Sequence, residues 1–261
     1  MKYENRIVLF LDILGFEGII SKTVEKEIDD EEKISDLYQV LSLIRFQNDD
    51  VPNTKSKVIT HFSDSLVVSF REDDVGEFIV FFREILDLVT KLIRHGILCR
   101  GGISHGKLYH SDELLFGPAL IDAYQTESRA ALYPRIILDR HTVDLLHSNY
   151  QERVTGSIEQ MRFDPKVRSI LTRDTDEKLY IDYFEGALTL FQDKTLVSYF
   201  KQLRKIIVGG QRFTKPDVKV KYGWMKNKFN KFLKNLPSTA HENMFWHDHY
   251  DLLLKNIAPI K

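Results

Sequence analysis

A continuous apolar run near the start of the chain, RIVLFLDIL at residues 6–14, constrains the fold more than any other segment. It has the length of a β-strand and ends at Gly15, which is typical of a central strand covered on both faces. One acid, Asp12, lies inside the run. Burying an ionised carboxylate is costly unless a cation or hydrogen bonds compensate for the lost water. The run therefore predicts a core strand whose single acid needs a partner.

The rest of the chain mixes helical and strand periodicity. Helices are expected at 16–22, 31–46, 75–94, 119–131 and 142–146, and strands at 57–62, 66–70, 98–105, 107–110, 135–139 and 178–184. This order predicts an α+β fold, with an antiparallel or mixed sheet that carries helices on one side. After about Gly186 the sequence becomes helical and basic. We therefore expect one domain over 1–186 and a C-terminal extension of two or three helices over 187–261.

Composition excludes several classes of protein. The 37 Lys and Arg residues balance 38 Asp and Glu residues, so no charge excess points to nucleic acid or to an anionic membrane surface. Cys99 is the single cysteine and cannot form an internal disulfide. The chain starts without a signal-peptide pattern and has no apolar run of about 20 residues. We expect a cytoplasmic protein that neither binds nucleic acid nor inserts into a membrane.

Two acids occupy places where a carboxylate is expensive. Asp64 lies on the tight turn of a predicted hairpin, so it meets Asp12 at one end of the sheet if that hairpin pairs with the first strand. Together the two carboxylates suit a hard divalent cation, whereas each alone is equally well explained as a cap or turn residue. Arg100, beside glycines, is a candidate for binding an anion, with a surface strand arginine as the alternative.

Four motifs in order resemble those of the class III nucleotidyl cyclases. They are FLDILGF at 10–16, FSDSLVVSF at 62–70, RGGISHG at 100–106 and GPALIDA at 117–123. The resemblance implies a ferredoxin-like cyclase catalytic domain that binds two Mg²⁺ or Mn²⁺ ions. In it Asp12 and Asp64 carry the metals and Ile13 lends a backbone carbonyl. By the same resemblance Gly15 and Phe16 cradle the phosphates of a nucleoside triphosphate, and Arg100 contacts them.

The departures from the family pattern concern the base and the transition state. Thr60 stands where purine cyclases have a lysine that reads adenine, and Leu114 stands where they have a second base-reading acid. A base other than a purine is therefore expected. The transition-state arginine of the family falls on Gln125, and its asparagine falls on Ile121. Arg129, one helical turn beyond Gln125, is a candidate for the missing charge, with a solvated helix residue as the alternative.

Taken together, these motifs are most similar to the pyrimidine cyclases of the bacterial Pycsar anti-phage defence system. That resemblance implies conversion of UTP or CTP into cyclic UMP or cyclic CMP, which activates a separate effector protein. It also implies a homodimer with its sites at the interface. Residues 178–184 and 221–232 resemble the C-terminal extension of that group. Two alternatives stay open, a non-catalytic cyclase-like module that binds nucleotide or dimerises, and a purine cyclase with relocated base contacts.

Overall fold

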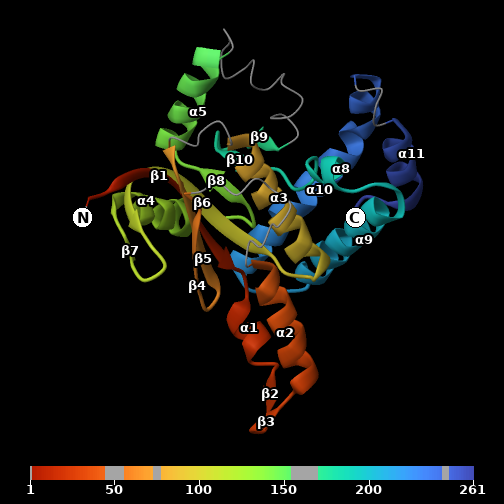
Figure 1. Cartoon of the computed structure of the whole chain (residues 1–261). Helices are drawn as coiled ribbons and strands as arrows, with labels where there is room; N and C mark the ends of the chain where they lie inside the picture. The colour runs from red at the N-terminus through yellow and green to blue at the C-terminus, as the bar shows by residue number, and fades with distance from the viewer. Residues whose placement is uncertain (1, 45–55, 73–77, 154–169, 243–246) are drawn as a thin grey trace.

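The computed structural model describes residues 2–44, 56–72, 78–153, 170–242 and 247–261 (Figure 1). Its strands are β1 (Glu4–Ile13), β2 (Val24–Glu25), β3 (Ile28–Asp29), β4 (Val58–Phe62), β5 (Ser65–Arg71), β6 (Cys99–His110), β7 (Leu115–Phe116), β8 (Ile136–Leu138), β9 (Leu171–Arg173) and β10 (Leu179–Ile181). Its helices are α1 (Phe16–Ile20), α2 (Glu31–Ile44), α3 (Phe78–Arg94), α4 (Pro118–Gln125) with a π-helical turn (Thr126–Ala130), α5 (Arg140–Arg153), α8 (Ala187–Leu190), α9 (Asp193–Gly210), α10 (Pro216–Glu242) and α11 (His247–Asn256). The predicted helix at 75–94 begins outside the described residues.

The main sheet is mixed, as the sequence predicts. Its strand order is β4-β5-β1-β6-β8-β10-β9, with β7 paired to β6 as a side hairpin. Strand β1 lies antiparallel between β5 and β6, and the pair of β6 with β8 is parallel. The expected α+β class is confirmed, and the apolar run at 6–14 forms the strand at the centre of the sheet.

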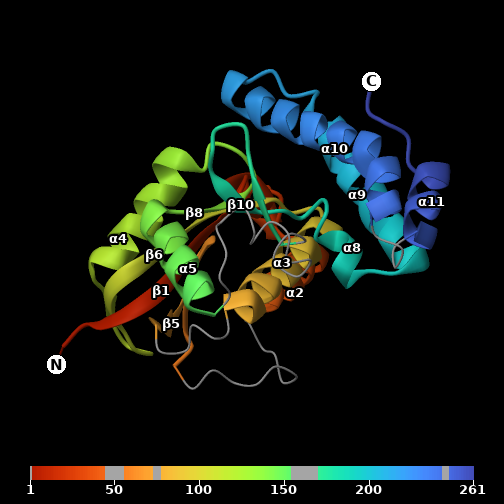
Figure 2. The ribbon, with the colours of Figure 1, turned by 90° about the horizontal axis from the view of Figure 1, so that it is seen from above.

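Strand β1 is apolar throughout because both of its faces are covered. Ile7, Leu9 and Leu11 belong to the large core that includes α3, whereas Val8 and Phe10 belong to a smaller cluster with Ala119 and Ala123 of α4. The expectation that all helices lie on one side of the sheet is therefore wrong. Figure 2 shows α3 and α4 on opposite sides of β1 and β6. The alanines allow α4 to approach the strands closely enough to bury Val8 and Phe10 completely or nearly so.

The C-terminal helices form a layer of their own beside α3. Buried side chains of α9 and α10, among them Phe200, Leu203 and Phe229, join the same core as the sheet (Figure 2). A helical C-terminal extension is thus confirmed, and the domain boundary near residue 186 stays a prediction. Pro216 begins α10, as its position after a polar linker predicts. None of the helices in the described ranges combines the length and the apolar character needed to cross a membrane.

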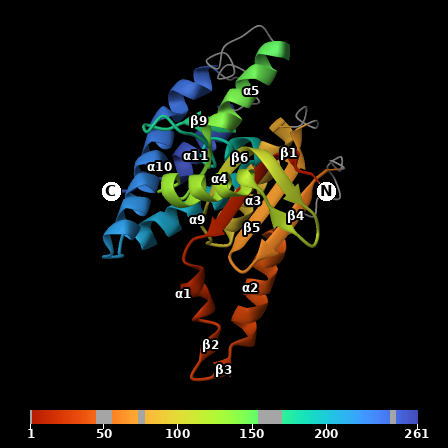
Figure 3. The ribbon, with the colours of Figure 1, turned by 90° about the vertical axis from the view of Figure 1, so that its left-hand side faces the viewer.

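Several local predictions differ from the structure. Strand β6 runs without a break from Cys99 to His110, because Gly106 continues it at a φ of 155° instead of ending it. The short helix expected at 142–146 is the longer α5, and the helix expected at 119–131 changes from α-helix to a π-helical turn after Gln125. The sequence does not predict the β2–β3 hairpin, since two-residue strands leave no periodicity. It ends an arm, formed with α1 and α2, that projects from the body in Figures 1 and 3.

Candidate functional site

The sequence-predicted acids Asp12 and Asp64 meet at one end of the sheet. Asp12 is the penultimate residue of β1 and lies opposite Ser65 of β5, the residue after Asp64. The Ile13 N–H donates a hydrogen bond of 3.0 Å to the Asp64 carbonyl. In a strand the N–H and C=O of one residue point to the same side, so the Ile13 carbonyl also faces the Asp64 turn. The structure thus brings Asp12, Ile13 and Asp64 together.

The hairpin between β4 and β5 holds Asp64 in place. Its turn residue Ser63 adopts a positive φ of 53°, and Asp64 follows as a half-buried residue. Positive φ in a two-residue turn matches the twist of the flanking strands and so favours the pairing of β4 with β5. The strand pairing of β5 with β1 then places the Asp64 carboxyl on the same edge of the sheet as Asp12.

The Asp12 carboxyl is under electrostatic strain. Burial raises the pKa of Asp12 above its usual value, Arg100 opposes this effect, and the charge of Asp64 raises the pKa further. Two carboxylates that repel each other in a partly desolvated place are stabilised by a cation between them. The pair therefore has the electrostatic character of a cation site.

Arg100, the predicted anion-binding residue, lies opposite Asp12 across the β1–β6 pair. Its Nε is 3.5 Å from Asp12 Oδ2 and 2.5 Å from Glu127 Oε1. The side chain of Arg100 is 26% exposed, so its remaining N–H groups can still reach a ligand. Two acids thus hold Arg100, which connects β1 to the π-helical turn that follows α4.

Glu127 also belongs to this cluster of charged residues, and it was not predicted from the sequence. It lies in the π-helical turn, its side chain is 3% exposed, and Oε1 has no aligned hydrogen-bond donor among the described residues. Burial raises the pKa of Glu127, and Arg100 opposes that effect. A signal existed in the sequence, since Ala119, Ala123 and Glu127 repeat at the spacing of one helix face. Two residues of that face pack on the sheet, so the third points to it as well.

Gly102 of β6 allows the π-helical turn that carries Glu127 to approach the strand closely. A side chain at Gly102 would put its Cβ 2.3 Å from the Ala123 carbonyl oxygen and 2.7 Å from the Glu127 nitrogen. Only glycine leaves room for this backbone contact. Gly102, the second glycine of RGGISHG, therefore sets the distance between β6 and the π-helical turn, and with it the contact between Arg100 and Glu127.

Lys221 of α10 adds a second cation from the C-terminal extension. It is half-buried and lies one turn before Trp224, whose ring stacks on Tyr133 with centroids 5.2 Å apart. Tyr133 precedes β8, and the neighbouring Arg135 carbonyl accepts a 3.1 Å hydrogen bond from the Gly101 N–H. Burial, Arg100 and Asp64 have the larger effects on the pKa of Asp12, and the positive charge of Lys221 also lowers it.

The donor set fits a hard divalent cation shared with a phosphate. In the described ranges no group of three or more His, Cys, Asp or Glu side chains is arranged to hold a metal ion. Mg²⁺ in proteins is commonly held by one or two carboxylates, with water and phosphate oxygens completing its shell. Asp12 and Asp64 supply two carboxylates, and their mutual repulsion is relieved by such an ion. The Ile13 carbonyl supplies a further oxygen.

Gly15 and Phe16 follow directly on β1. Gly15 adopts the left-handed conformation, with a φ of 75°, and caps the short helix α1. It is exposed, Phe16 is half-buried, and no atom of the described residues lies within 4 Å of a Cβ built on Gly15. The segment is thus open on the side of the sheet end where Asp12 lies, and its role in phosphate binding stays a prediction.

Thr60 and Leu114 form a second group, apart from the acids. Thr60 Oγ1 lies 2.9 Å from His110 Nε2. His110 is the last residue of β6 and pairs with Leu115, the residue after Leu114, in the β6–β7 hairpin. The structure therefore brings the two expected base-reading positions to the same region, linked through a histidine that was not predicted to take part.

Gln125 and Arg129 are not brought to the acids within one chain. Gln125 is half-buried and Arg129 is exposed, and the described structure has no hydrogen bond or ion pair between either residue and Asp12 or Asp64. Glu127, which lies between them, is the residue of this helix that faces Arg100. Any role of Gln125 and Arg129 in catalysis remains a prediction.

No model of a known protein family matches this chain, and no curated protein matches it. Among solved structures it is similar to a bacterial light-regulated adenylyl cyclase, with 16% identity over 79% of this chain and 100% of that chain and a TM-score of 0.44. It is also similar to the adenylyl cyclase CyaB from P. aeruginosa, with 19% identity over 56% of this chain and 82% of that chain and a TM-score of 0.39. Because the identity to these structures is so low, the function of this chain has to be argued from the residues that meet at the end of its sheet.

Proposed function

We propose that the chain is a nucleotidyl cyclase, a lyase that converts UTP or CTP into the 3′,5′-cyclic monophosphate and pyrophosphate. The observation that carries this proposal is the meeting of Asp12 and Asp64 beside Arg100 at the end of the central strand. A purely structural strand gains nothing from a half-buried carboxylate whose pKa is raised by burial and, to a lesser extent, by a second acid. Perturbed acids beside cations are typical of active sites.

The proposed metal ligands are Asp12, Asp64 and the Ile13 carbonyl. They would hold two Mg²⁺ or Mn²⁺ ions, which when bound lower the pKa of the ribose 3′-hydroxyl and neutralise the departing pyrophosphate. The chain's own groups bind and orient the substrate. In this proposal the N–H groups of Arg100, the backbone at Gly15 and Phe16, and the ammonium of Lys221 bind the anionic phosphate chain.

In the reaction the 3′-oxygen of the ribose attacks the α-phosphorus, and the bond from that phosphorus to the bridging oxygen of pyrophosphate breaks. Negative charge grows on the leaving oxygen as the bond breaks. Arg100 is held towards this site by Glu127 and Asp12, so its charge is fixed in place before the substrate binds. Such fixed charge stabilises the transition state without a cost for reorganisation.

A pyrimidine base is proposed from Thr60 and Leu114. By the resemblance to class III cyclases, these positions carry the lysine and the acid that read a purine. Thr60 is short and half-buried, and Leu114 is 53% exposed and apolar. Neither side chain offers the charged contacts of a purine cyclase. The defence role and the action of the product on a separate effector are proposed on the Pycsar resemblance alone. The cytoplasmic location is proposed from the single cysteine, which cannot form an internal disulfide.

A homodimer is proposed from the exposed apolar side chains around α4. Leu114 and Phe116 of the β6–β7 hairpin are 53% and 41% exposed, and Ile121 and Tyr124 of α4 are 56% and 52% exposed. Clustered exposed apolar groups of this size are typical of an interaction surface. In a symmetric dimer this surface would bring Gln125 and Arg129 of one protomer near the partner.

The test is incubation of the purified protein with ATP, GTP, CTP and UTP in turn, with Mn²⁺ or Mg²⁺, and identification of products by mass. We expect a cyclic pyrimidine monophosphate and pyrophosphate. A cyclic purine product would establish a purine cyclase instead. A folded protein that binds nucleotide and forms no cyclic product from any of the four would be a nucleotide-binding module. Light scattering on the same sample measures whether it is a dimer.

Replacement of Lys221 with glutamine is expected to lower kcat/KM by about tenfold to a hundredfold, because it removes one cation from the phosphate-binding region. The matched control is Lys219→Gln, which removes a lysine of the same helix that is exposed. Steady-state kinetics with both variants checks this, and melting temperatures check the fold. Equal activity of the two variants would contradict a role of Lys221 in binding the phosphates.

A further inference from the structure

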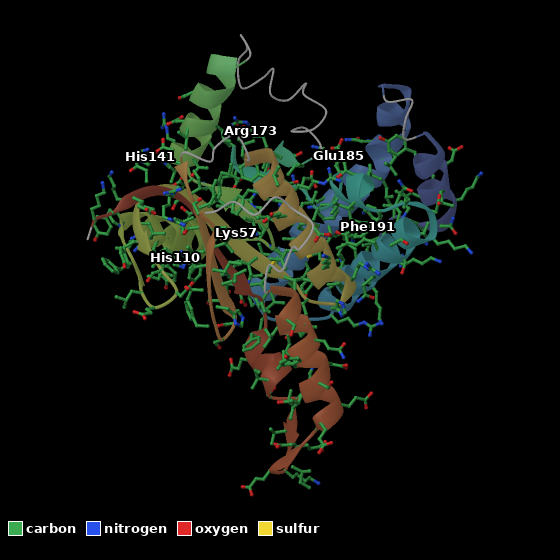
Figure 4. All side chains as sticks on the ribbon, in the orientation of Figure 1. Lys57, His110, His141, Arg173, Glu185 and Phe191 are labelled. Atoms are coloured by element: carbon green, nitrogen blue, oxygen red, sulfur yellow. The ribbon has the colours of Figure 1, made fainter. Side chains whose placement is uncertain are left out.

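A line of polar side chains crosses the sheet from the core to Thr60. Arg6 Nε donates a hydrogen bond of 2.8 Å to Ser69 Oγ, which lies 2.8 Å from His110 Nδ1, and His110 Nε2 lies 2.9 Å from Thr60 Oγ1. Arg6, Ser69 and His110 are 3%, 0% and 8% exposed, whereas Thr60 is half-buried. His110, labelled in Figure 4, lies on the side of the molecule that carries β7 and α4. The line therefore starts in the core and ends at a hydroxyl that a ligand can reach.

The direction of each hydrogen bond follows from the chemistry of its groups. A guanidinium only donates, so Ser69 Oγ accepts from Arg6 and must place its own proton elsewhere. Among the hydrogen bonds of the described residues, the one acceptor beside that hydroxyl is His110 Nδ1. Ser69 is fully buried, and a buried hydroxyl without an acceptor is costly. Nδ1 of His110 therefore accepts, and the ring proton is on Nε2.

The ring carries only that one proton at neutral pH. Burial lowers the pKa of His110 to about 4, and the positive charge of Arg6 acts in the same direction, against a smaller effect of Asp112. Nε2–H then donates to Thr60 Oγ1, so the oxygen of Thr60 already accepts a hydrogen bond. Its own proton has no acceptor among the described residues, and it is left to donate to a ligand.

We propose that Thr60 reads the substrate base as a hydrogen-bond donor, that Ser69 and His110 are positioning residues which hold it in that role, and that the substrate is therefore UTP. This rests on the proposed function, in which Thr60 occupies the base-reading position. Uracil presents the O4 carbonyl, an acceptor, where cytosine presents an amino group, a donor. The Thr60 oxygen already accepts a hydrogen bond from the buried His110 N–H, so its proton can donate to O4 of uracil. Against cytosine the same proton faces an amino group, and two donors cannot form a hydrogen bond. A site built to hydrogen-bond one group rejects the analogue that cannot pair with it.

The tautomer is tested without any substrate. In protein labelled with ¹⁵N-histidine, the His110 resonances, assigned by their loss in His110→Gln, should show a protonated Nε2 and an unprotonated Nδ1. In Ser69→Ala the acceptor role of Nδ1 is no longer fixed, and the ring should populate both tautomers. A protonated Nδ1 in the wild type would overturn the proposal, whatever the enzyme does.

Base choice is tested by binding and turnover of UTP and CTP. We expect the wild type to favour UTP by at least about tenfold in both Kd and kcat/KM. Thr60→Val, which keeps the shape and removes the hydroxyl, should bring the UTP to CTP ratio close to one, and Thr60→Ser should keep the preference. Ser69→Ala should reduce the preference for UTP about threefold to tenfold, because it removes the hydroxyl that fixes the His110 tautomer. Melting temperatures of all variants show whether each one is folded.

The outcomes separate this inference from the proposed function. A cyclic product formed equally well from UTP and CTP overturns the base choice and leaves the cyclase in place. Preferential binding of UTP without a cyclic product supports the role of Thr60 and contradicts the cyclase. Binding of neither nucleotide overturns both.

Discussion

Replacement of Asp64 with asparagine is expected to abolish cyclic nucleotide formation, lowering kcat/KM by at least about a thousandfold, or about 4 kcal/mol of transition-state stabilisation. The amide keeps the shape of the side chain but removes the charge that the proposed cation site needs. Asp64 lies at the tip of the β4–β5 hairpin and is half-buried, so the fold should tolerate the change. The check is product formation from UTP at saturating Mn²⁺.

The loss must be traced to the metal rather than to the fold. Mn²⁺ with a nucleoside triphosphate should raise the melting temperature of the wild type, because a ligand that binds only the folded state stabilises it. The rise should be absent in Asp64→Asn. The matched control is Glu27→Gln, an acid at the tip of the β2–β3 hairpin on the projecting arm. Full activity in Asp64→Asn, or an equal loss in Glu27→Gln, would contradict the assignment of Asp64.

Elements with a strong apolar pattern are the ones that the sequence predicts well. The run at 6–14 indicates a buried strand because its apolar side chains satisfy both faces at once. The two short apolar runs at 57–62 and 66–70 are separated by three polar residues, which indicates a hairpin with Asp64 at its tip. These two patterns are enough to predict that Asp12 and Asp64 meet if the hairpin pairs with the first strand. The pairing of Ser65 with Asp12 confirms that placement.

Residues that reach the site through tertiary packing were not predicted. Lys221 lies far along the chain from Asp12, and nothing in the helical pattern of α10 tells which of its lysines turns inwards. Stacking of Trp224 on Tyr133 decides that, and no local rule predicts such a contact. His110 was hidden for a different reason. Gly106 has the local character of a strand end, so the sequence pattern divides in two the single strand that carries His110 towards Thr60.

Glu127 illustrates an intermediate case. The spacing with Ala119 and Ala123 indicates the right helix face, but the change from α-helix to a π-helical turn after Gln125 leaves no signal in the sequence pattern. A π-helical turn within a helix is frequent at functional sites. Here it carries the buried carboxylate of Glu127, which lies 2.5 Å from Arg100 Nε.

Asp174, which follows β9, joins Arg135, immediately before β8, to Lys228 and Trp224 of α10. The side chains of Arg135 and Asp174 are 0% and 1% exposed, and Asp174 also accepts hydrogen bonds of 2.6 Å from Lys228 Nζ and 2.8 Å from Trp224 Nε1. Burial acts to raise the pKa of Asp174, but the hydrogen bonds from Lys228, the Thr175 N–H and Trp224 outweigh it, and the pKa is lowered. One carboxylate thus pairs with four groups, from Arg135, Thr175, Trp224 and Lys228.

Replacement of Asp174 with alanine is therefore expected to lower the free energy of unfolding by about 3–5 kcal/mol, since it leaves Arg135 and Lys228 buried with one acid fewer. Urea unfolding followed by Trp fluorescence measures the loss. Asp144→Ala is the matched control, because its partner Arg140 is 93% exposed and the pair should contribute less than about 1 kcal/mol. A loss below about 1 kcal/mol in Asp174→Ala would show that α10 is held by its apolar contacts alone.

The same carboxylate predicts a pH dependence with a definite sign. A lowered pKa means that folding favours the charged form, so the stability it adds is complete above the unfolded pKa of about 4 and is lost as the pH falls below that value. Between pH 5 and 3 the wild type should thus lose more stability than Asp174→Asn, which has no such group to protonate. Because α10 carries Lys221 as well as Lys228 and Trp224, two partners of Asp174, acid that loosens this helix should also withdraw a cation from the site. Loss of activity should therefore accompany loss of stability below about pH 4 in the wild type.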